Sequence, residues 1–191
     1  MAVPSSAARC RLVHLHFYML DIIGGPGQTA VRVVRGQGPP HPSMPGSYFG
    51  DTAVIDDLLT EGPSLTSKAV GRAQGTYVLA AMDAPVLAVS VTVVITEGPY
   101  NGSTLVIAGR DDISQEVREL AVVGGTGQLR RATGHVVWRS AEDVSAVYMV
   151  LELDVHATVP NGAAAGRRHG WGWPAAAEGI RNMSAGLSAD S

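Results

Sequence analysis

Apolar and polar residues alternate with a period of two along most of this chain, which is typical of strands that bury one face. Nine such runs, separated by glycine, proline and aspartate, cover residues 11–23, 29–34, 47–56, 69–82, 86–96, 103–108, 122–127, 134–140 and 147–155. About eight or nine short strands with almost no helix indicate an antiparallel barrel or sandwich. Only residues 111–119 have a helical pattern, for which Asp112 or Ser114 is the expected N-cap.

Three other stretches lack the alternation. Residues 36–46 contain four prolines, so they cannot join a sheet ladder and are expected to form an excursion. Residues 57–68 carry the Asp, Thr, Gly and Pro typical of turns. Beyond about Ala157 the pattern stops in favour of Ala, Gly, Pro and Arg, and no second domain or internal repeat is visible.

Length and composition fit one globular domain. The 191 residues are 46% apolar, which is enough for a single core. Charged residues make up 16% with a net charge of −3, so neither nucleic acid nor an anionic membrane is an expected partner. We predict an N-terminal arm, a β domain and a low-complexity, disordered tail, formed by residues 1–12, 13–157 and 158–191.

The remaining bulk features concern compartment and cross-links. The single cysteine, Cys10, excludes an intramolecular disulfide. No apolar stretch reaches the length of a transmembrane helix. The first ten residues lack the charged and apolar regions of a signal peptide, which on its own predicts an intracellular protein.

An aspartate ends the apolar face of the first run. That face consists of Val13, Leu15, Phe17, Met19 and then Asp21. If the face is buried, desolvation raises the pKa of the Asp21 carboxyl toward the range where it can act as an acid near neutral pH. In the alternative interpretation the strand ends earlier and Asp21 caps the glycine turn that follows it.

The opposite face of the same run carries His14 and His16, spaced as a pair of zinc ligands can be. A third ligand would have to come from His135, His156 or a carboxylate, and no motif supports one. The two glycine clusters of the chain match neither the Rossmann nor the P-loop spacing. The sequence therefore predicts neither a metal site nor a nucleotide cofactor.

Two further patterns suggest a pocket. Asp111 and Arg118 lie seven residues apart, which on a helix places them on one face, as a structural ion pair or at a pocket mouth. Along residues 69–77, small residues on one face lead to Tyr77. If that face points inward, it leaves room for a planar aromatic or lipid-like guest; close packing against another strand or subunit is the alternative.

Several motifs occur together in a fixed order. They are Phe17–Ile22, Val54–Asp57, Leu59–Pro63, Ser67–Gly75, Glu97–Leu105, Val117–Leu120 and Val122–Gly127. Together they resemble the plant dirigent family over roughly residues 14–155. The resemblance implies an eight-stranded antiparallel β-barrel like that of allene oxide cyclase, with an internal pocket and usually assembled as a homotrimer.

The resemblance also implies a function. Dirigent proteins impose regio- and stereochemistry on the coupling of two phenoxyl radicals, typically from coniferyl alcohol, in lignan biosynthesis. A separate laccase or peroxidase supplies the radicals, so no cofactor is expected and the partners are a small phenol, the oxidase and other copies of the chain. Some relatives instead act directly on quinone methides, and a non-catalytic, defence-related binding protein is a third interpretation. The family is usually apoplastic, although no signal peptide is visible here.

By the same resemblance, six residues are assigned to the pocket. The expected catalytic residues are Asp21, Asp111 and Arg118, and the expected substrate-binding residues are Tyr77, Ser140 and Met149. Two positions depart from the family pattern. Leu20 stands where many members have His, and Met149 stands where others have an aromatic residue, which bears on substrate identity and product handedness.

Overall fold

The fold is almost entirely β-structure. The computed structural model describes residues 10–161, and no α-helix occurs among them. The elements in chain order are β1 (Cys10–Ile22), β2 (Ala30–Val34), β3 (Thr52–Thr60), β4 (Ala69–Leu79), β5 (Val86–Ile95), the 3₁₀ turn η1 (Gly98–Tyr100), β6 (Thr104–Asp112), β7 (Val117–Gly125), the 3₁₀ turn η2 (Gly127–Leu129), β8 (Thr133–Ser145) and β9 (Tyr148–Pro160).

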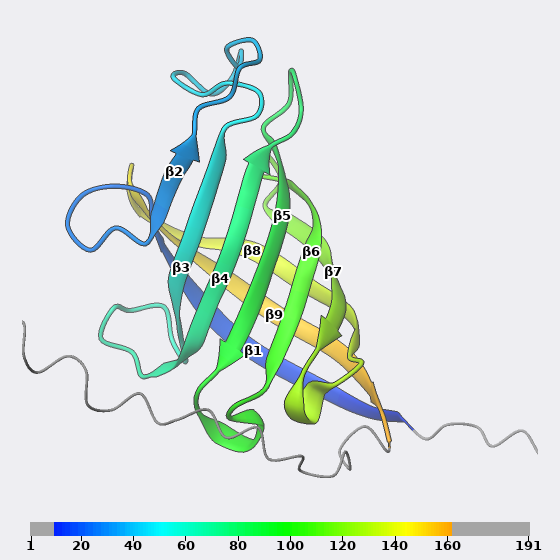
Figure 1. The fold of residues 1–191 in the computed structure, drawn as a ribbon. Coiled ribbons are helices and arrows are strands. Elements are labelled where there is room, and N and C mark those ends of the chain that lie inside the picture. The colour runs from blue at the N-terminus through cyan, green and yellow to red at the C-terminus, as the bar shows by residue number, and fades with distance from the viewer. Residues whose placement is uncertain (1–9, 162–191) are drawn as a thin grey trace, which may run out of the picture.

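Eight of these strands close into an antiparallel barrel. The hydrogen-bonded order runs β1-β9-β8-β7-β6-β5-β4-β3, and β1 also pairs with β3, which completes the circle (Figure 1). The predicted eight-stranded barrel is therefore confirmed. Within the described residues, no helix is long and apolar enough to cross a membrane.

The strand β2 lies outside the circle because β3 divides one edge between two partners. The end of β3, from Leu58 to Thr60, pairs with β1, whereas its beginning pairs with β2. Thr29 spans the fork between them: its N–H donates to the Ile22 carbonyl (2.9 Å), and its own carbonyl accepts from the Asp56 N–H (3.0 Å). The barrel wall thus splits beside Asp57.

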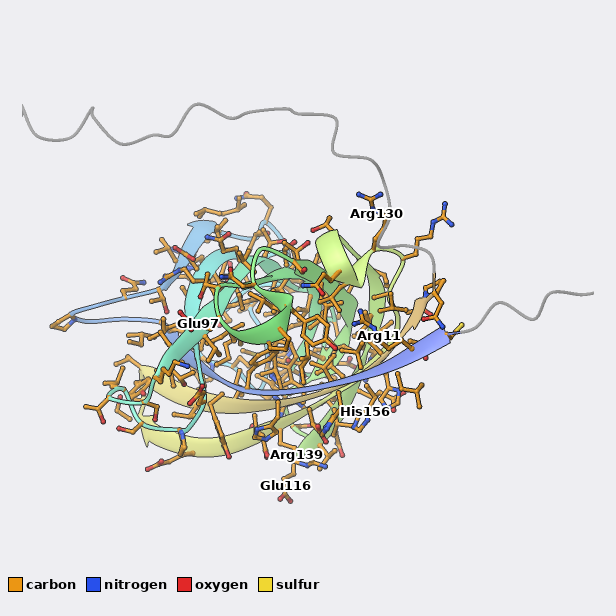
Figure 2. The ribbon with its side chains drawn as sticks, turned by 90° about the horizontal axis from the view of Figure 1, so that it is seen from below. Arg11, Glu97, Glu116, Arg130, Arg139 and His156 are labelled. Atoms are coloured by element: carbon orange, nitrogen blue, oxygen red, sulfur yellow. The ribbon has the colours of Figure 1, made fainter. Side chains whose placement is uncertain are left out.

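Period-two alternation decides which side chains fill the barrel. In β9, Leu153 and Val155 are fully buried, whereas Asp154 and His156 between and beside them lie on the outer surface. Figure 2 shows His156 and Arg139 projecting away from the interior. Each strand has one face inside the barrel, away from water, and one face in contact with water. Apolar residues are therefore favoured at the inward positions and polar residues at the outward positions.

One predicted element is wrong. Residues 111–119 form the end of β6, a tight turn and the start of β7, not a helix. The Asp112 carboxylate accepts hydrogen bonds from the Ser114 N–H (3.2 Å) and hydroxyl (2.6 Å), which makes an Asx turn. The residues expected to cap a helix use the same chemistry to close a hairpin.

Strand boundaries also differ from the pattern. The turn predicted from residue 57 begins only after Thr60, because pairing with β1 and β4 holds 57–60 in β3. Conversely, residues 47–51 precede β3 and are not extended strand. Paired structure runs from Cys10 to Pro160, past both ends of the predicted 13–157 domain. The rest of the predicted tail, from residue 162, lies outside the described residues.

Small residues in β4 serve the fit between strands. Their face points inward, as Ala73 is fully buried in the core. A Cβ atom built on Gly71 would lie 2.2 Å from the Val94 carbonyl oxygen, and one on Gly75 would lie 2.2 Å from the Ser90 carbonyl oxygen. Glycine is therefore required by the close approach of β5, while Tyr77 at the end of the same face lines a cavity.

Gly71→Ala is expected to lower the free energy of unfolding by about 2 kcal/mol, because the new methyl group meets backbone atoms that cannot rotate away. The control is Gly124→Ala, where an added Cβ meets nothing within 4 Å, and a change below about 0.5 kcal/mol is expected. Urea denaturation of both variants measures the difference. Equal stability of the two would refute the close-approach explanation.

Candidate functional site

A cavity of about 430 Å³ occupies one end of the barrel. Its wall is mostly apolar, with side chains from β1, β3, β4, β5 and β8 among its contributors. All six site residues predicted from the sequence line it: Asp21, Tyr77, Asp111, Arg118, Ser140 and Met149. Strand alternation explains the convergence, since five of these residues occupy inward positions near an end of their strands, and Ser140 lies beside the bulge of β8.

A buried ion pair forms one polar side of the cavity. Arg118 Nε donates to Asp111 Oδ1 at 2.8 Å, and the two side chains are 4% and 7% exposed. Arg118 Nη1 donates to the Ser140 hydroxyl at 2.9 Å and to the carbonyl oxygens of Gln115 and Glu116. The β6–β7 hairpin, and not a helical turn, brings Asp111 and Arg118 together.

Asp21 forms a second polar side without a charged partner. It is 7% exposed, and its Oδ1 has no hydrogen-bond partner among the described residues. Burial raises the pKa of the Asp21 carboxyl to about 6. Desolvation disfavours the carboxylate, so the neutral acid persists to near-neutral pH.

Asp57 is a polar residue of this region that the sequence interpretation assigned to a turn. It is 0% exposed, and neither of its oxygens makes a hydrogen bond of normal geometry. Met19 faces Leu59 in the β1–β3 ladder, and two residues further along each strand the same register leads to Asp21 and Asp57. The inward parity of Ile55, Asp57 and Leu59 was the available signal.

The two carboxyls influence each other and Tyr77. Burial, and then the nearby charge of Asp21, raise the pKa of Asp57 to about 7, although the Thr29 hydroxyl opposes this shift. Burial, followed by the charges of both aspartates, also raises the pKa of the Tyr77 phenol. Two buried carboxyls this close favour holding at least one proton between them, and Tyr77 stays a neutral hydrogen-bonding group.

Trp138 is a further wall residue that the sequence pattern did not single out. Its indole N–H is buried and lacks an acceptor among the described residues, although the residue lines the cavity. An unpaired buried donor is expensive, so a guest oxygen is a natural acceptor for it. Met149 supplies a flexible apolar wall on β9.

A second hollow of about 500 Å³ adjoins the first beneath the proline-rich excursion. The two hollows share the side chains of Ile23, Met44, Tyr77 and Leu87. The two hollows therefore adjoin along these four side chains. Leu20, the departure beside Asp21, is fully buried between strands and lines neither hollow.

The cavity therefore has a neutral acid and a cation in the lining of one largely apolar space. There Asp21 can donate a proton, while Arg118 and its hydrogen-bonded neighbours can stabilise negative charge. Comparison with known proteins agrees with the fold. The family model of dirigent-like proteins matches residues 12–158. The chain belongs to the dirigent family.

Relatives within the family include proteins named dirigent proteins and proteins named pterocarpan synthases. Dirigent protein 1 of Arabidopsis thaliana is 44% identical over 127 residues, which are 66% of this chain and 68% of that protein. Pterocarpan synthase 1 of Glycyrrhiza echinata is 42% identical over 126 residues, 65% of each chain. A solved pterocarpan synthase dirigent protein superposes with a TM-score of 0.73 at 35% identity, covering 84% of this chain and 92% of that one.

The raised pKa values of Asp21 and Asp57 predict how stability depends on pH. Both exceed the value of about 4 for an unfolded aspartate, so between about pH 4 and pH 7 the folded chain holds more protons than the unfolded chain. The free energy of unfolding should therefore fall as the pH rises through this window, by roughly 3 kcal/mol for Asp21 and roughly 4 kcal/mol for Asp57 if both shifts act in full. Urea denaturation across the window measures it.

Asp57→Asn should remove about half of that fall, because one of the two titrating carboxyls is lost. Asp83→Asn, an exposed change in the β4–β5 connection, should leave the pH dependence as it is. An Asp57→Asn protein with the full wild-type decrease would contradict the assignment of these protons.

Proposed function

We propose that the barrel controls the stereochemistry of ring closure in a phenolic quinone methide, with Asp21 as the proton donor. The observation that carries the proposal is a buried carboxyl with a pKa raised to about 6, which lines the same largely apolar cavity as an arginine. An acid of this kind is still protonated in part near neutral pH, where it can both give and take back a proton.

The step can be written as a balanced isomerisation. The Asp21 carboxyl protonates the quinone-methide oxygen, the ring becomes aromatic, and the benzylic carbon becomes electrophilic. A hydroxyl of the same molecule then forms a C–O bond to that carbon, and its proton returns to the Asp21 carboxylate. Asp111 already pairs with Arg118 at 2.8 Å, so we assign donation to Asp21 and charge stabilisation to Arg118.

Lignan-type coupling is the source of the quinone methide that we propose first. Two adjoining hollows of about 430 and 500 Å³ suit two aromatic rings held with their reacting carbons facing each other. An external laccase or peroxidase would make the phenoxyl radicals from a monolignol such as coniferyl alcohol. Action in the apoplast as a homotrimer belongs to the same proposal and is supported by family membership.

A second candidate function is cyclisation of a preformed quinone methide without any oxidant. The observation in its favour is the similarity to pterocarpan synthases, at 42% identity in one case and a TM-score of 0.73 in another. Asp21 would play the same chemical part. The two functions differ in whether radicals are consumed.

Asp21→Asn is expected to leave ligand binding within about threefold of wild type and to lower the rate of stereoselective product formation by about 100-fold, because shape is kept while the proton is lost. Chiral chromatography gives rate and enantiomeric excess, and fluorescence titration gives binding. The matched control is Asp56→Asn, whose side chain is exposed on the outer face of β3. Unchanged enantiomeric excess and rate in Asp21→Asn would overturn the assignment of the proton donor to Asp21.

The two sources of quinone methide are separated by one pair of assays. With coniferyl alcohol, we expect an enantiomeric excess in the coupled product only when laccase and the barrel protein are both present. A panel of preformed quinone methides is incubated with the protein alone. Stereoselective cyclisation there, with racemic product from the laccase assay, would replace the first function by the second.

A further inference from the structure

Three histidines form a row across the outer surface of the barrel. His14 on β1 lies opposite His156 on β9, and His156 lies opposite His135 on β8. The rings stack, with centroids 4.8 Å apart for His14 and His156 and 5.1 Å apart for His156 and His135. The row faces away from the cavity, so the proposed acid chemistry leaves it unexplained.

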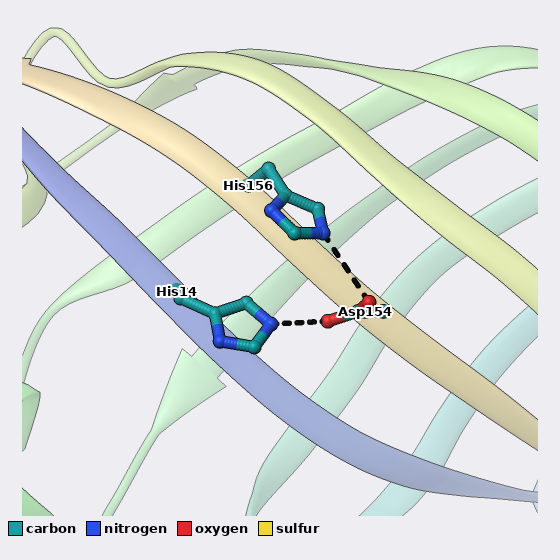
Figure 3. A group of neighbouring side chains, drawn as sticks. All are labelled: His14, Asp154 and His156. Carbon is teal, nitrogen blue, oxygen red and sulfur yellow. Dashed lines mark hydrogen bonds and ion pairs between the residues drawn. The ribbon is translucent and has the colours of Figure 1, made fainter.

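The carboxylate of Asp154 contacts both His14 and His156. His14 Nε2 is hydrogen-bonded to Asp154 Oδ1, and His156 Nε2 lies 3.2 Å from Asp154 Oδ2 (Figure 3). The Asp154 carboxylate thus presents one oxygen to each of the two imidazoles.

The geometry points to a site for a divalent transition-metal ion of the zinc class, held by His14, Asp154 and His156. One ligand atom from each residue lies within 4.8 Å of the others. Tetrahedral zinc with bonds of about 2.0–2.1 Å separates its ligand atoms by roughly 3.3 Å. Small rotations of surface side chains supply the difference, and water completes the coordination.

The ligand set decides the class of ion. Two imidazole nitrogens and one carboxylate oxygen suit Zn²⁺, Cu²⁺ or Ni²⁺, whereas Ca²⁺ and Mg²⁺ prefer oxygen ligands alone. The side chains of His14 and His156 are 62% and 45% exposed, and that of Asp154 is 24% exposed, so an ion can enter from solvent. Without the ion, the imidazoles hydrogen-bond to Asp154 instead.

The site would clamp two strands that are far apart in sequence. His14 belongs to the first strand and both other ligands to the last, and the ladder between these strands runs the length of β1. An ion bound only by the folded chain raises its stability by mass action. The role is structural and leaves the cavity on the opposite face untouched.

The chain supplies its own control on the same surface. His16 follows His14 on the outer face of β1, and its Nε2 lies 2.7 Å from Glu152 Oε1 on β9. Like the proposed site, this pair joins an imidazole to a carboxylate, but no second histidine contacts Glu152 among the described residues. His16→Gln should therefore keep the ion.

The experiment is a titration of the full chain with Zn²⁺ by isothermal calorimetry, followed by thermal unfolding with and without Zn²⁺. We expect one ion per chain and a higher Tm with zinc. His156→Gln and Asp154→Asn should each weaken zinc binding by about tenfold or more, because one of three protein ligands is lost, whereas His16→Gln stays within about twofold. Circular dichroism checks that every variant is folded.

A second measurement tests ligand identity. The electron paramagnetic resonance spectrum of the Cu²⁺-loaded chain should show coupling to two imidazole nitrogens, reduced to one in His156→Gln. Absence of saturable zinc binding in the wild-type chain would overturn the proposal. Equal loss in His16→Gln and His156→Gln would overturn it as well, because binding would then not depend on this triad.

Discussion

The shape of the whole barrel depends on how β3 divides its edge. Its last residues pair with β1 and close the circle, while its first residues pair with β2. At the fork, backbone groups are satisfied by Thr29 and not by a continuous ladder. A barrel closed by full-length pairing on every side would have no such opening, and the two aspartates lie beside it. The way the barrel closes therefore also determines where these aspartates lie.

Charge within the cavity is arranged in two contrasting ways. Arg118 and Asp111 satisfy each other and are anchored to the β6–β7 turn, so this pair is fixed in place. Asp21, which lines the cavity, and Asp57, which is buried near it, lack such partners, and burial favours their neutral acid forms. In the proposed function, a guest in the cavity meets both a proton source and a cation. The shape of the cavity selects the orientation of the guest. The positions of the acid and the cation then decide which atom of the guest is protonated and where negative charge is stabilised.

Much of this arrangement could be predicted from the sequence, for a physical reason. A strand exposes alternate residues to opposite sides, so parity put Asp21 on the same face as Met19, and the resemblance to the dirigent family favoured a pocket position over a turn cap. Local signals failed where one chemistry serves two structures: Asp112 and Ser114 suit a helix cap and a hairpin turn equally. Asp57 was missed because two adjacent aspartates look like a turn unless the pairing of β3 is known. The histidine cluster depends on a contact between residues 140 positions apart, which no local pattern encodes.

The pairing of β1 with β9 also determines when the barrel can close during synthesis. Every residue of β1 is matched to a residue of β9, so the partner of Cys10 is made about 150 residues later. During synthesis the early strands leave the ribosome without this partner, and the apolar face of β1 stays open to water or to chaperones. Synthesis of β9 is thus the event that allows the barrel to close, and Asp21 becomes buried only after that strand has paired with β1.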